Sequence, residues 1–403
     1  MAEMLIEAER IVPAAALPGL ADRLHLAPGY VLVRDGVIET VGEGPPPRQP
    51  DVRLDSGVLV PGFVDLQVNG YFGAELEAVR AAERRMVAAR LPETGTTAFM
   101  PTFITAPVPR LARALRLASA LRQAARRTRE QGPEARVLGV HLEGPFISPL
   151  RAGAHNKDWM TDPAPAAVSE LLDAGGGILK IVTLAPERHG ALDAITRLAE
   201  AGVLVSVGHT DALASQVAAA AGAGARMVTH LFNAQRPLHH REPGTPGQAL
   251  SDPRLTSGLI ADFHHVAPAV CAVAFAAAPG RICLVTDAAA CAGMPPGTYL
   301  LGGEPIELPD GDGTPPVRAS GTLAGSALRM DVAVANMVRA GAGLPHAVAA
   351  ATRIPADLIG RPELGRIVPG ARADLAWLGE DLRARATWVD GDLVYREETM
   401  REW

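Results

Sequence analysis

Short apolar runs alternate with longer Ala- and Leu-rich segments through the middle of the chain. The longer segments, such as residues 108–128, 166–174 and 192–201, have the length and apolar spacing of helices. Eight runs have the length of β-strands, at residues 60–67, 96–100, 136–142, 179–184, 203–207, 226–229, 257–260 and 282–286. Strands that alternate with helices predict a parallel sheet, and eight such units predict an α/β fold of the closed (β/α)8 or TIM-barrel type.

Both ends of the chain have a different pattern, in which short alternating runs are separated by turns. Asp35-Gly36 and Asp390-Gly391 each lie between two such runs, which is the strongest short signal for a β-hairpin. Strands from distant parts of a sequence can pair when the residues between them form a compact insert. We therefore expect a small β-sandwich subdomain from residues 1–59 and 365–403, and a barrel from residues 60–364.

Polar residues lie at the ends of several predicted barrel strands. Glu143, His209, His230 and Asp287 lie at or just after the ends of the third, fifth, sixth and eighth strands. A single buried Glu or His is usually a paired structural residue. In a barrel, however, the carboxyl ends of all strands meet at one mouth, and a carboxylate with two imidazoles suits a divalent transition metal. The sequence therefore predicts a metal site at this mouth.

The composition is that of an ordinary globular protein, with 48% hydrophobic and 20% charged residues in a chain of 403. A net charge of -6 provides no basic surface, so we expect no binding of nucleic acid. The acidic start of the chain lacks the basic segment and continuous apolar core of a signal peptide. This pattern favours a cytoplasmic protein.

The most apolar stretch of the chain covers residues 266–280 and contains Pro268. It is too short to span a membrane, so we expect no membrane association and interpret the stretch as a buried helix. Cys271, Cys283 and Cys291 are odd in number and form no C-x-x-C pair. We expect them to be reduced packing residues, because neither a disulfide framework nor a cysteine metal site is indicated.

Eight short motifs follow one another between about residues 58 and 378. They are P-G-F-V-D-L-Q-V-N-G at 61–70, H-L-E-G-P at 141–145, G-H-T at 208–210, T-H-L-F-N-A at 229–234, R-E-P-G at 241–244, L-V-T-D at 284–287, G-T-L-A-G-S at 321–326 and A-T-R-I-P-A at 351–356. In content and order, the motifs resemble those of the N-acetylglucosamine-6-phosphate deacetylases, a branch of the metal-dependent amidohydrolase superfamily. Each motif is short, but the set as a whole is specific.

The resemblance implies a role for individual residues. By position in these motifs, the resemblance implies that Glu143, His209 and His230 are the metal ligands, Asp287 is the catalytic acid/base, and Asn233 and Ala234 belong to the segment that meets the sugar phosphate. His155 and His265 lie outside these motifs and match the substrate-contacting histidines of the family. Arg241 matches an arginine that the neighbouring subunit lends to the site. The resemblance therefore also implies a homodimer with a shared active site. His264 lies beside His265, so the assignment of the second histidine can shift by one residue.

Gln67 and Asn69 occupy the positions at which most amidohydrolases carry a His-x-His pair that binds a second metal. An amide is a poorer ligand for a transition metal than an imidazole. We therefore expect one divalent ion per chain, with zinc as the first choice and iron, cobalt or manganese as alternatives, and a second, weak metal site is left open. Gln67 either contacts a metal-bound water or only forms hydrogen bonds.

The expected activity is hydrolysis of the acetamide of N-acetylglucosamine 6-phosphate, which releases glucosamine 6-phosphate and acetate. One alternative is an amidohydrolase with another N-acyl or cyclic amide substrate, such as N-acetylgalactosamine 6-phosphate. An amidohydrolase for unphosphorylated substrates would not need the phosphate-binding residues Asn233, Ala234 and Arg241. A second alternative is a non-catalytic barrel scaffold, which predicts the loss of metal ligands. The sequence leaves open the sugar epimer and whether the phosphate is obligatory.

Overall fold

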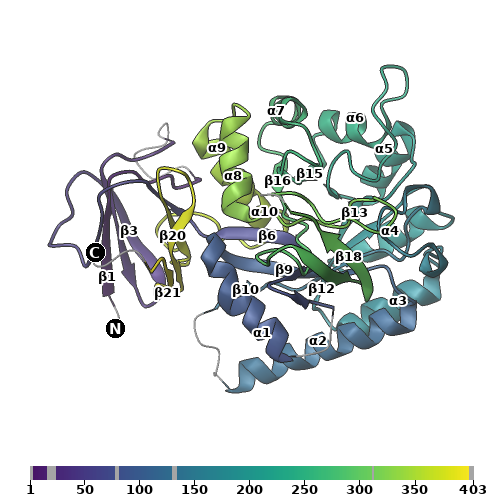
Figure 1. Ribbon diagram of the computed structural model, residues 1–403, viewed down its shortest axis with the longest axis horizontal. Coiled ribbons are helices and arrows are strands. Elements are labelled where there is room, and N and C mark those ends of the chain that lie inside the picture. Colours follow the sequence, from purple (N-terminus) through teal and green to yellow (C-terminus); the bar gives the residue numbers. More distant parts are fainter. Residues whose placement is uncertain (1–2, 16–23, 78–80, 129–133, 311–312, 399–403) are drawn as a thin grey trace.

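Eight parallel strands form the barrel at the centre of the computed structural model, which describes residues 3–15, 24–77, 81–128, 134–310 and 313–398 (Figure 1). The barrel strands are β6 (Phe63–Val68), β9 (Thr96–Ile104), β11 (Val140–Glu143), β12 (Leu179–Leu184), β13 (Leu204–Val207), β14 (Met227–Val228), β15 (Thr256–Leu259) and β16 (Ile282–Leu284). Each overlaps one of the eight predicted runs. The prediction of an α/β barrel is therefore confirmed.

Two of the predicted strands are each divided in the structure. The run at 60–67 becomes β5 (Val58–Pro61) and β6, and the run at 136–142 becomes β10 (Arg136–Val137) and β11. A Cβ at Gly62 would lie 2.2 Å from a threonine hydroxyl oxygen, and a Cβ at Gly139 would lie 2.3 Å from a lysine side-chain carbon. Each predicted strand is interrupted at its glycine because the backbone there passes so close to a neighbouring side chain that no Cβ atom would fit.

The barrel closes between β6 and the segment that follows β16, without a regular ladder between these two strands. The backbone N–H of Asp287 donates to the carbonyl oxygen of Gln67 at 2.9 Å. Below this contact, the buried Asp65 carboxylate accepts a hydrogen bond from the Thr286 hydroxyl at 2.6 Å. These bonds hold Gln67 and Asp287 next to each other at the carboxyl end of the barrel.

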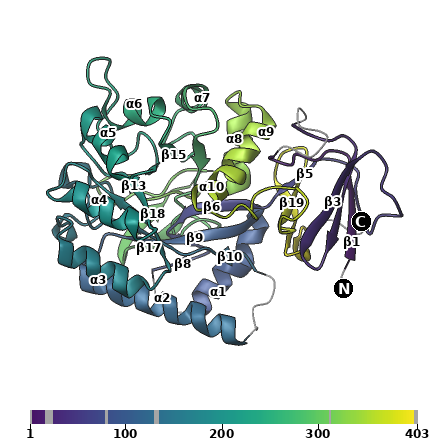
Figure 2. The same ribbon diagram turned by 180° about the vertical axis from the view of Figure 1, so that it is seen from behind.

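Helices cover the outside of the barrel (Figures 1 and 2). The helices of the described residues are α1 (Ala81–Arg90), α2 (Val108–Thr128), α3 (Pro165–Gly175), α4 (Ala191–Glu200), α5 (Ala214–Ala223), α6 (Gly244–Ser251), α7 (Pro268–Ala277), α8 (Met330–Arg339), α9 (Leu344–Ala351) and α10 (Arg353–Leu358). α2, α3 and α4 confirm the three helices predicted at 108–128, 166–174 and 192–201. Within the described residues, none of the helices has both the length and the apolar character needed to cross a bilayer.

The prediction of a buried helix at residues 266–280 is wrong. α7 lies on the surface with Val270 37% exposed and Val273 61% exposed, while Cys271 and Ala274 form its buried side. Apolar composition predicted a helix correctly but could not tell whether its outer face is covered by the same chain. All three cysteines are buried and unpaired, as predicted.

The small subdomain consists of two four-stranded sheets that share one hydrophobic core. One sheet has the order β3 (Val37–Glu43), β2 (Gly29–Arg34), β1 (Glu3–Ala8), β4 (Val52–Leu54), and the other has the order β21 (Asp392–Arg396), β20 (Ala384–Val389), β19 (Leu375–Leu378), β5. The first and the last described strands, β1 and β21, both lie in this subdomain (Figure 1). The predicted β-sandwich from both termini is confirmed. Because β5 pairs with β19, the sandwich reaches residue 61, and the division at residues 59 and 60 stays a prediction.

Both predicted hairpins form at their Asp-Gly pairs. Asp35 and Gly36 join β2 to β3 with φ angles of 49° and 78°, and Asp390 and Gly391 join β20 to β21 with φ angles of 53° and 82°. Two successive left-handed residues are the mark of the tight turn that suits twisted strands, so Asp-Gly is favoured here. The remaining elements are short: β7 (Gly70–Tyr71), β8 (Ala74–Glu75), β17 (Gly297–Leu301), β18 (Glu304–Leu308) and the 3₁₀ turns at Leu91–Thr94, Pro149–Arg151 and Lys157–Trp159.

A fully buried carboxylate joins the barrel to the small subdomain. Asp331 of α8 pairs with Arg329 at 2.8 Å and with Arg383 at 3.6 Å, and it accepts the backbone N–H of Ala384 at the start of β20 at 3.2 Å. The Asp331 side chain is 0% exposed. Its removal would leave two guanidinium groups and the backbone N–H groups of Val332 and Ala384 without their carboxylate partner.

We expect Asp331→Ala to lower the free energy of unfolding by roughly 2–4 kcal/mol, because breaking a buried ion pair leaves uncompensated charge. Both arginines are partly exposed, so water screens part of this charge and moderates the loss. Chemical denaturation followed by circular dichroism measures the change. Asp357→Ala is the matched control, since Asp357 also pairs with two arginines but is 43% exposed. Equal losses in the two variants would contradict the role assigned to Asp331.

Candidate active site

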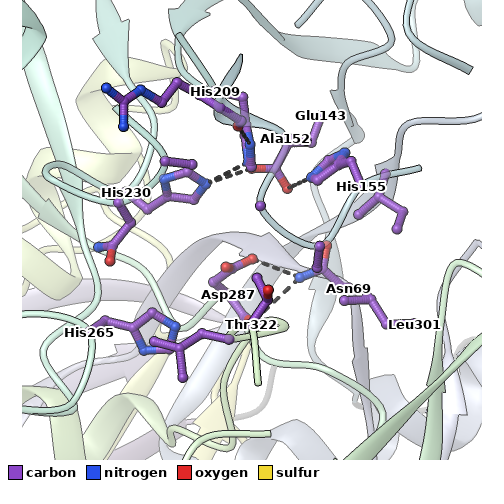
Figure 3. Close-up of a pocket in the computed structure, with 18 of the residues that line it drawn as sticks. Asn69, Glu143, Ala152, His155, His209, His230, His265, Asp287, Leu301 and Thr322 are labelled. Atoms are coloured by element: carbon purple, nitrogen blue, oxygen red, sulfur yellow. Dashed lines mark hydrogen bonds and ion pairs between the residues drawn. The ribbon is translucent and has the colours of Figure 1, made fainter. Parts of the chain in front are cut away.

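The four residues predicted as metal ligands and acid/base face one cavity at the carboxyl ends of the barrel strands (Figure 3). Glu143 ends β11, while His209, His230 and Asp287 follow β13, β14 and β16. The cavity has a volume of about 490 Å³, and all four side chains line it. The fold thus brings together side chains that lie up to 144 positions apart in the sequence, from Glu143 to Asp287 (287 minus 143).

Three of these residues adopt left-handed backbone conformations that non-glycine residues rarely take. The φ angles are 47° at His209, 27° at His230 and 52° at Asp287. Each such residue costs on the order of 1–3 kcal/mol and persists only where the surroundings hold it. Here backbone bonds do so: the His209 carbonyl accepts the N–H of Ser148 at 2.9 Å, and the Asp287 carbonyl accepts the N–H of Ser326 at 2.9 Å. Such strain is common at functional sites.

The side chains of Glu143, His209 and His230 meet at one point. Glu143 Oε1 lies 2.8 Å from His230 Nε2 and 3.2 Å from His209 Nε2, and the two nitrogens are 3.1 Å apart. On its other side, His209 Nδ1 lies 2.9 Å from the carbonyl oxygen of Arg151. Since a carbonyl only accepts, Nδ1 carries the proton, and the Nε2 of a neutral ring carries a lone pair.

That lone pair of His209 faces a carboxylate oxygen of Glu143, which also only accepts. A cation between the two would satisfy both groups, and nitrogen and oxygen ligands of this kind suit zinc and related ions. Burial by itself raises the pKa of Glu143, but the contacts with the rings of His209 and His230 hold that pKa well below its usual value, so the carboxylate is ionised. The donor set therefore fits a divalent metal ion.

A second group of potential ligands overlaps the first. Ligand atoms of Glu143, His155 and His209 also lie within 4.8 Å of one another. His155 Nε2 is 3.9 Å from Glu143 Oε2, compared with 2.8 Å between His230 Nε2 and Glu143 Oε1. The shorter distance favours His230 as the third ligand. Burial lowers the pKa of His155 to about 3, so its ring is neutral at pH 7, and its Nδ1 lies 2.8 Å from the Thr105 hydroxyl.

Asp287 is held by two amide side chains from the end of β6. Gln67 Nε2 donates to Asp287 Oδ1 at 3.0 Å and to Glu143 Oε1 at 3.1 Å, and Asn69 Nδ2 donates to Asp287 Oδ1 at 2.7 Å. Both donors use Oδ1, which leaves Oδ2 without a donor among the described residues. Burial, and then the charge of Glu143, raise the pKa of Asp287 to about 6. A carboxylate with a pKa near neutrality can both take and return a proton.

His265 lines the same cavity, whereas the neighbouring His264 is exposed. His265 Nδ1 lies 2.6 Å from Asp262 Oδ2, and Asp262 Oδ1 also accepts the backbone N–H groups of both histidines. Burial would raise the pKa of Asp262, but the hydrogen bonds and charge of His265 lower it below its usual value. Asp262 therefore fixes the ring so that Nε2 is left for the cavity.

The predicted phosphate residues separate into two places. Asn233 and Ala234 line the cavity, but Arg241 does not belong to its lining. Arg241 is exposed near the tip of a hairpin in which His239 and Glu242 exchange backbone hydrogen bonds at 3.1 and 3.2 Å. In Figure 1, the chain between α5 and α6 projects from the barrel.

Sequence reasoning missed several residues that support the site. Thr105, Asp262 and Asp211 contact His155, His265 and Arg151 respectively. The pattern of apolar and polar positions along the chain does not distinguish any of these three residues from ordinary loop residues. Asp262 had a weak signal, because an Asp three residues before a His can form a turn that bonds both backbone and ring. Asp211 directly follows the G-H-T motif, and that adjacency was its only signal.

Comparison with known proteins gives consistent results. The amidohydrolase family model matches residues 58–394. N-acetylgalactosamine-6-phosphate deacetylase of Escherichia coli O157:H7 is 37% identical over 90% of this chain and 93% of its own length, and N-acetylglucosamine-6-phosphate deacetylase of Bacillus subtilis is 37% identical over 77% of this chain and 78% of its own.

A solved structure of N-acetyl-D-glucosamine-6-phosphate deacetylase from Mycobacterium smegmatis, a variant in complex with N-acetyl-D-glucosamine-6-phosphate, is 36% identical. It superimposes with a TM-score of 0.89 over 98% of this chain and 100% of its own. Sequence and fold therefore agree along almost the whole length. The chain belongs to the amidohydrolase family, and its relatives within that family are deacetylases of N-acetylated amino-sugar phosphates.

Proposed function

We propose that this protein hydrolyses the acetamide of N-acetylglucosamine 6-phosphate. The observation that carries the proposal is the position of Asp287, which lines the same cavity as Glu143, His209 and His230 and whose Oδ2 has no donor among the described residues. Amide hydrolysis needs an activated water, a stabilised oxyanion and a proton for the departing amine. The residues of this one cavity can supply all three.

Glu143, His209 and His230 would hold one divalent ion, for which we propose zinc. When bound, such an ion supplies Lewis acidity, which makes water more acidic and stabilises negative charge on a carbonyl oxygen. Three protein ligands leave positions open for water and substrate, as a catalytic site requires. Gln67 bridges Glu143 and Asp287 through its amide nitrogen, so it orients both carboxylates instead of acting as a ligand.

Asp287 is the proposed acid/base. Its raised pKa of about 6 leaves it mostly ionised at neutral pH, ready to accept a proton from the attacking water. Once protonated, the same carboxyl can deliver that proton to the amine nitrogen, which otherwise leaves poorly. Gln67 and Asn69 keep Oδ1 occupied, so proton transfer falls to Oδ2.

His265 and His155 are the proposed substrate-orienting histidines. With Asp262 as a partner for its Nδ1, His265 keeps Nε2 free for the cavity, where the ring can orient the acetyl group of the substrate. His155 is neutral and presents an imidazole to the cavity, where a sugar hydroxyl can form a hydrogen bond to it. The two rings come from opposite parts of the cavity wall in Figure 3, which suits a ligand that lies between them.

The phosphate site is proposed to be shared between two subunits. Asn233 and Ala234 line the cavity of their own chain, while Arg241 is exposed on the hairpin and does not line that cavity. The exposed apolar residues Val273 on α7 and Leu238 beside the hairpin, 61% and 52% exposed, would be covered if a second copy packs here. A homodimer therefore accounts for the exposed apolar residues and for the position of Arg241 outside the cavity of its own chain.

We propose the cytoplasm as the location of the protein. A charged phosphate ester does not cross a bilayer readily, so the substrate and the enzyme that uses it must lie on the same side of the membrane.

The relatives leave one alternative substrate, because the Escherichia coli protein is an N-acetylgalactosamine-6-phosphate deacetylase. We expect the metal-reconstituted protein to release acetate from N-acetylglucosamine 6-phosphate faster than from the galactosamine epimer or from unphosphorylated N-acetylglucosamine. An acetate assay with all three compounds measures the difference. Activity should disappear with a chelator and return with zinc. A preference for the galactosamine epimer would change the assigned substrate, and no release from any of the three would refute the deacetylase.

Asp287→Asn keeps the shape of the side chain but removes its proton-carrying capacity. We expect turnover to fall by about a thousandfold or more, because general acid–base catalysis and water activation act together here. The dialysed variant should still hold one metal ion per chain by elemental analysis. Glu143→Gln is the contrast, since the loss of a charged ligand should remove the metal itself. Near-normal turnover in Asp287→Asn would show that another group carries the proton.

Arg241→Ala should weaken binding of the phosphorylated substrate and leave an unphosphorylated analogue little affected, because a guanidinium binds phosphate in a bidentate manner. The position of Arg241 in the dimer can be tested by refolding an equal mixture of Arg241→Ala and Asp287→Asn chains. About half of the dimers are then mixed, and each mixed dimer has one site with both residues intact, so roughly a quarter of all sites should recover. Rates at low substrate concentration report the recovery.

No recovery in that mixture, with mixed dimers shown to form, would mean that Arg241 serves its own chain. In that case the shared site would be wrong, while the deacetylase assignment would stand. Refolded wild-type protein is the control for losses during refolding.

A further inference from the structure

The Asp211 carboxylate joins two arginines that belong to different parts of the molecule. Asp211 Oδ1 lies 2.8 Å from Arg151 Nη2 and 2.9 Å from Arg151 Nε, while Oδ2 is in close contact with Arg236 Nη2. The Asp211 carbonyl also accepts a hydrogen bond from Arg236 Nε at 2.7 Å. The Asp211 side chain is only 17% exposed. Each oxygen of the carboxylate thus serves one guanidinium.

The first arginine, Arg151, contacts the proposed metal ligand His209 through its backbone carbonyl. The carbonyl oxygen of Arg151 is the acceptor for His209 Nδ1, and the N–H of Ser148 in the same segment bonds the His209 carbonyl. The segment is packed directly against the ring, since a Cβ at Gly153 would lie 3.1 Å from His209 Cε1. A shift of Arg151 therefore moves the group that fixes the tautomer and direction of His209.

The second arginine, Arg236, lies at the base of the hairpin that carries Arg241. Arg236 N–H donates to the Thr210 carbonyl at 3.0 Å, at the start of the hairpin. The end of the hairpin comes back to the same place, because a Cβ at Gly244 would lie 2.9 Å from the Arg236 carbonyl oxygen. A fixed Arg236 therefore fixes the base from which Arg241 projects.

A second carboxylate completes the cluster and holds Asp211 in place. Glu187 accepts the backbone N–H of Asp211 at 2.7 Å and is in close contact with the Thr210 hydroxyl. Asp211 and Glu187 balance the charges of Arg151 and Arg236. Glu187 pairs with the backbone and hydroxyl side of the turn, so of the two carboxylates it is Asp211 that contacts the guanidiniums.

We propose that Asp211 is a positioning residue that links the metal centre of its own chain to the phosphate-binding hairpin. Through Arg151 it holds the hydrogen-bond acceptor of His209, and through Arg236 it holds the base of the hairpin that presents Arg241. The proposal rests on the proposed function in two points, the ligation of metal by His209 and the phosphate contact of Arg241. Asp211 itself touches neither the metal nor the substrate.

The test compares Asp211→Asn with Asp357→Asn in the full-length dimer. Asp357 is the matched control because it also lies between two arginines, Arg353 and Arg366, but outside the cavity. Metal affinity is measured by titrating the apo protein with zinc against a chromogenic chelator, and KM is measured for phosphorylated and unphosphorylated substrates.

In Asp211→Asn we expect zinc affinity to fall by about tenfold, the lower end of the effect for groups that orient metal ligands. KM should rise several-fold for the phosphorylated substrate and stay constant for the unphosphorylated one. Asp357→Asn should change neither value. Unchanged affinity and unchanged KM in a folded Asp211→Asn protein would overturn the proposal.

Two further variants separate the branches and remain informative if Asp211→Asn fails to fold. Arg151→Ala should weaken zinc binding, and because Arg151 also lines the cavity, only its zinc affinity is diagnostic. Arg236→Ala should raise KM for the phosphorylated substrate without weakening zinc binding. Weaker zinc binding in Arg236→Ala, or neither effect from either arginine, would overturn the link. If wild-type protein releases no acetate, the proposed function fails, whereas the zinc titration still shows whether Asp211 acts through His209.

Discussion

The structure of the mouth depends on two lone pairs that face each other, that of His209 Nε2 and that of the Glu143 carboxylate. Its Oε1 faces two imidazole nitrogens, and His209 cannot donate to it because the proton of that ring is used at the Arg151 carbonyl. Such an arrangement is unfavourable for a buried carboxylate unless a cation is bound. The chemistry of the site follows from this constraint. Loss of the proposed cation would return electrostatic repulsion to the side chains around Glu143, so metal binding and local stability would be coupled.

The backbone conformation at the carboxyl ends of the barrel strands helps to direct the side chains of the site. His209 and Asp287 have left-handed conformations, which turn each side chain into the mouth directly after its strand. Bonds from outside the strands, from Ser148 and Ser326, hold these conformations. The Asp65 carboxylate holds the register between β6 and the segment after β16. The local strain at the site is therefore supported by neighbouring segments and not by the strands alone.

The sequence predicted much of the fold and the site because both depend on regular patterns. Strand–helix alternation predicts the barrel, and the Asp-Gly pairs predict the hairpins of the sandwich. The breaks at Gly62 and Gly139 depend on how closely another segment approaches, which periodicity does not contain. The exposure of α7 could not be predicted, since composition does not show which face another surface covers. Glu143, His209, His230 and Asp287 were found because strand ends converge, whereas Asp262 acts on its partner through a local turn.

Residues that position others are hard to predict from sequence for a general reason. Asp211 contacts Arg151 and Arg236, which lie 60 and 25 positions away, and neither pairing follows from a strand or helix period. Its influence reaches His209 through a backbone carbonyl, a group that every residue carries. A search for sequence motifs therefore detects His209 but not Asp211. The same carboxylate can constrain the proposed metal ligand His209 and the base of a projecting hairpin because both segments return to the turn that follows β13. Sites built at strand ends in this way acquire their coupling from loop contacts, and substitutions in those loops alter affinity without altering any ligand.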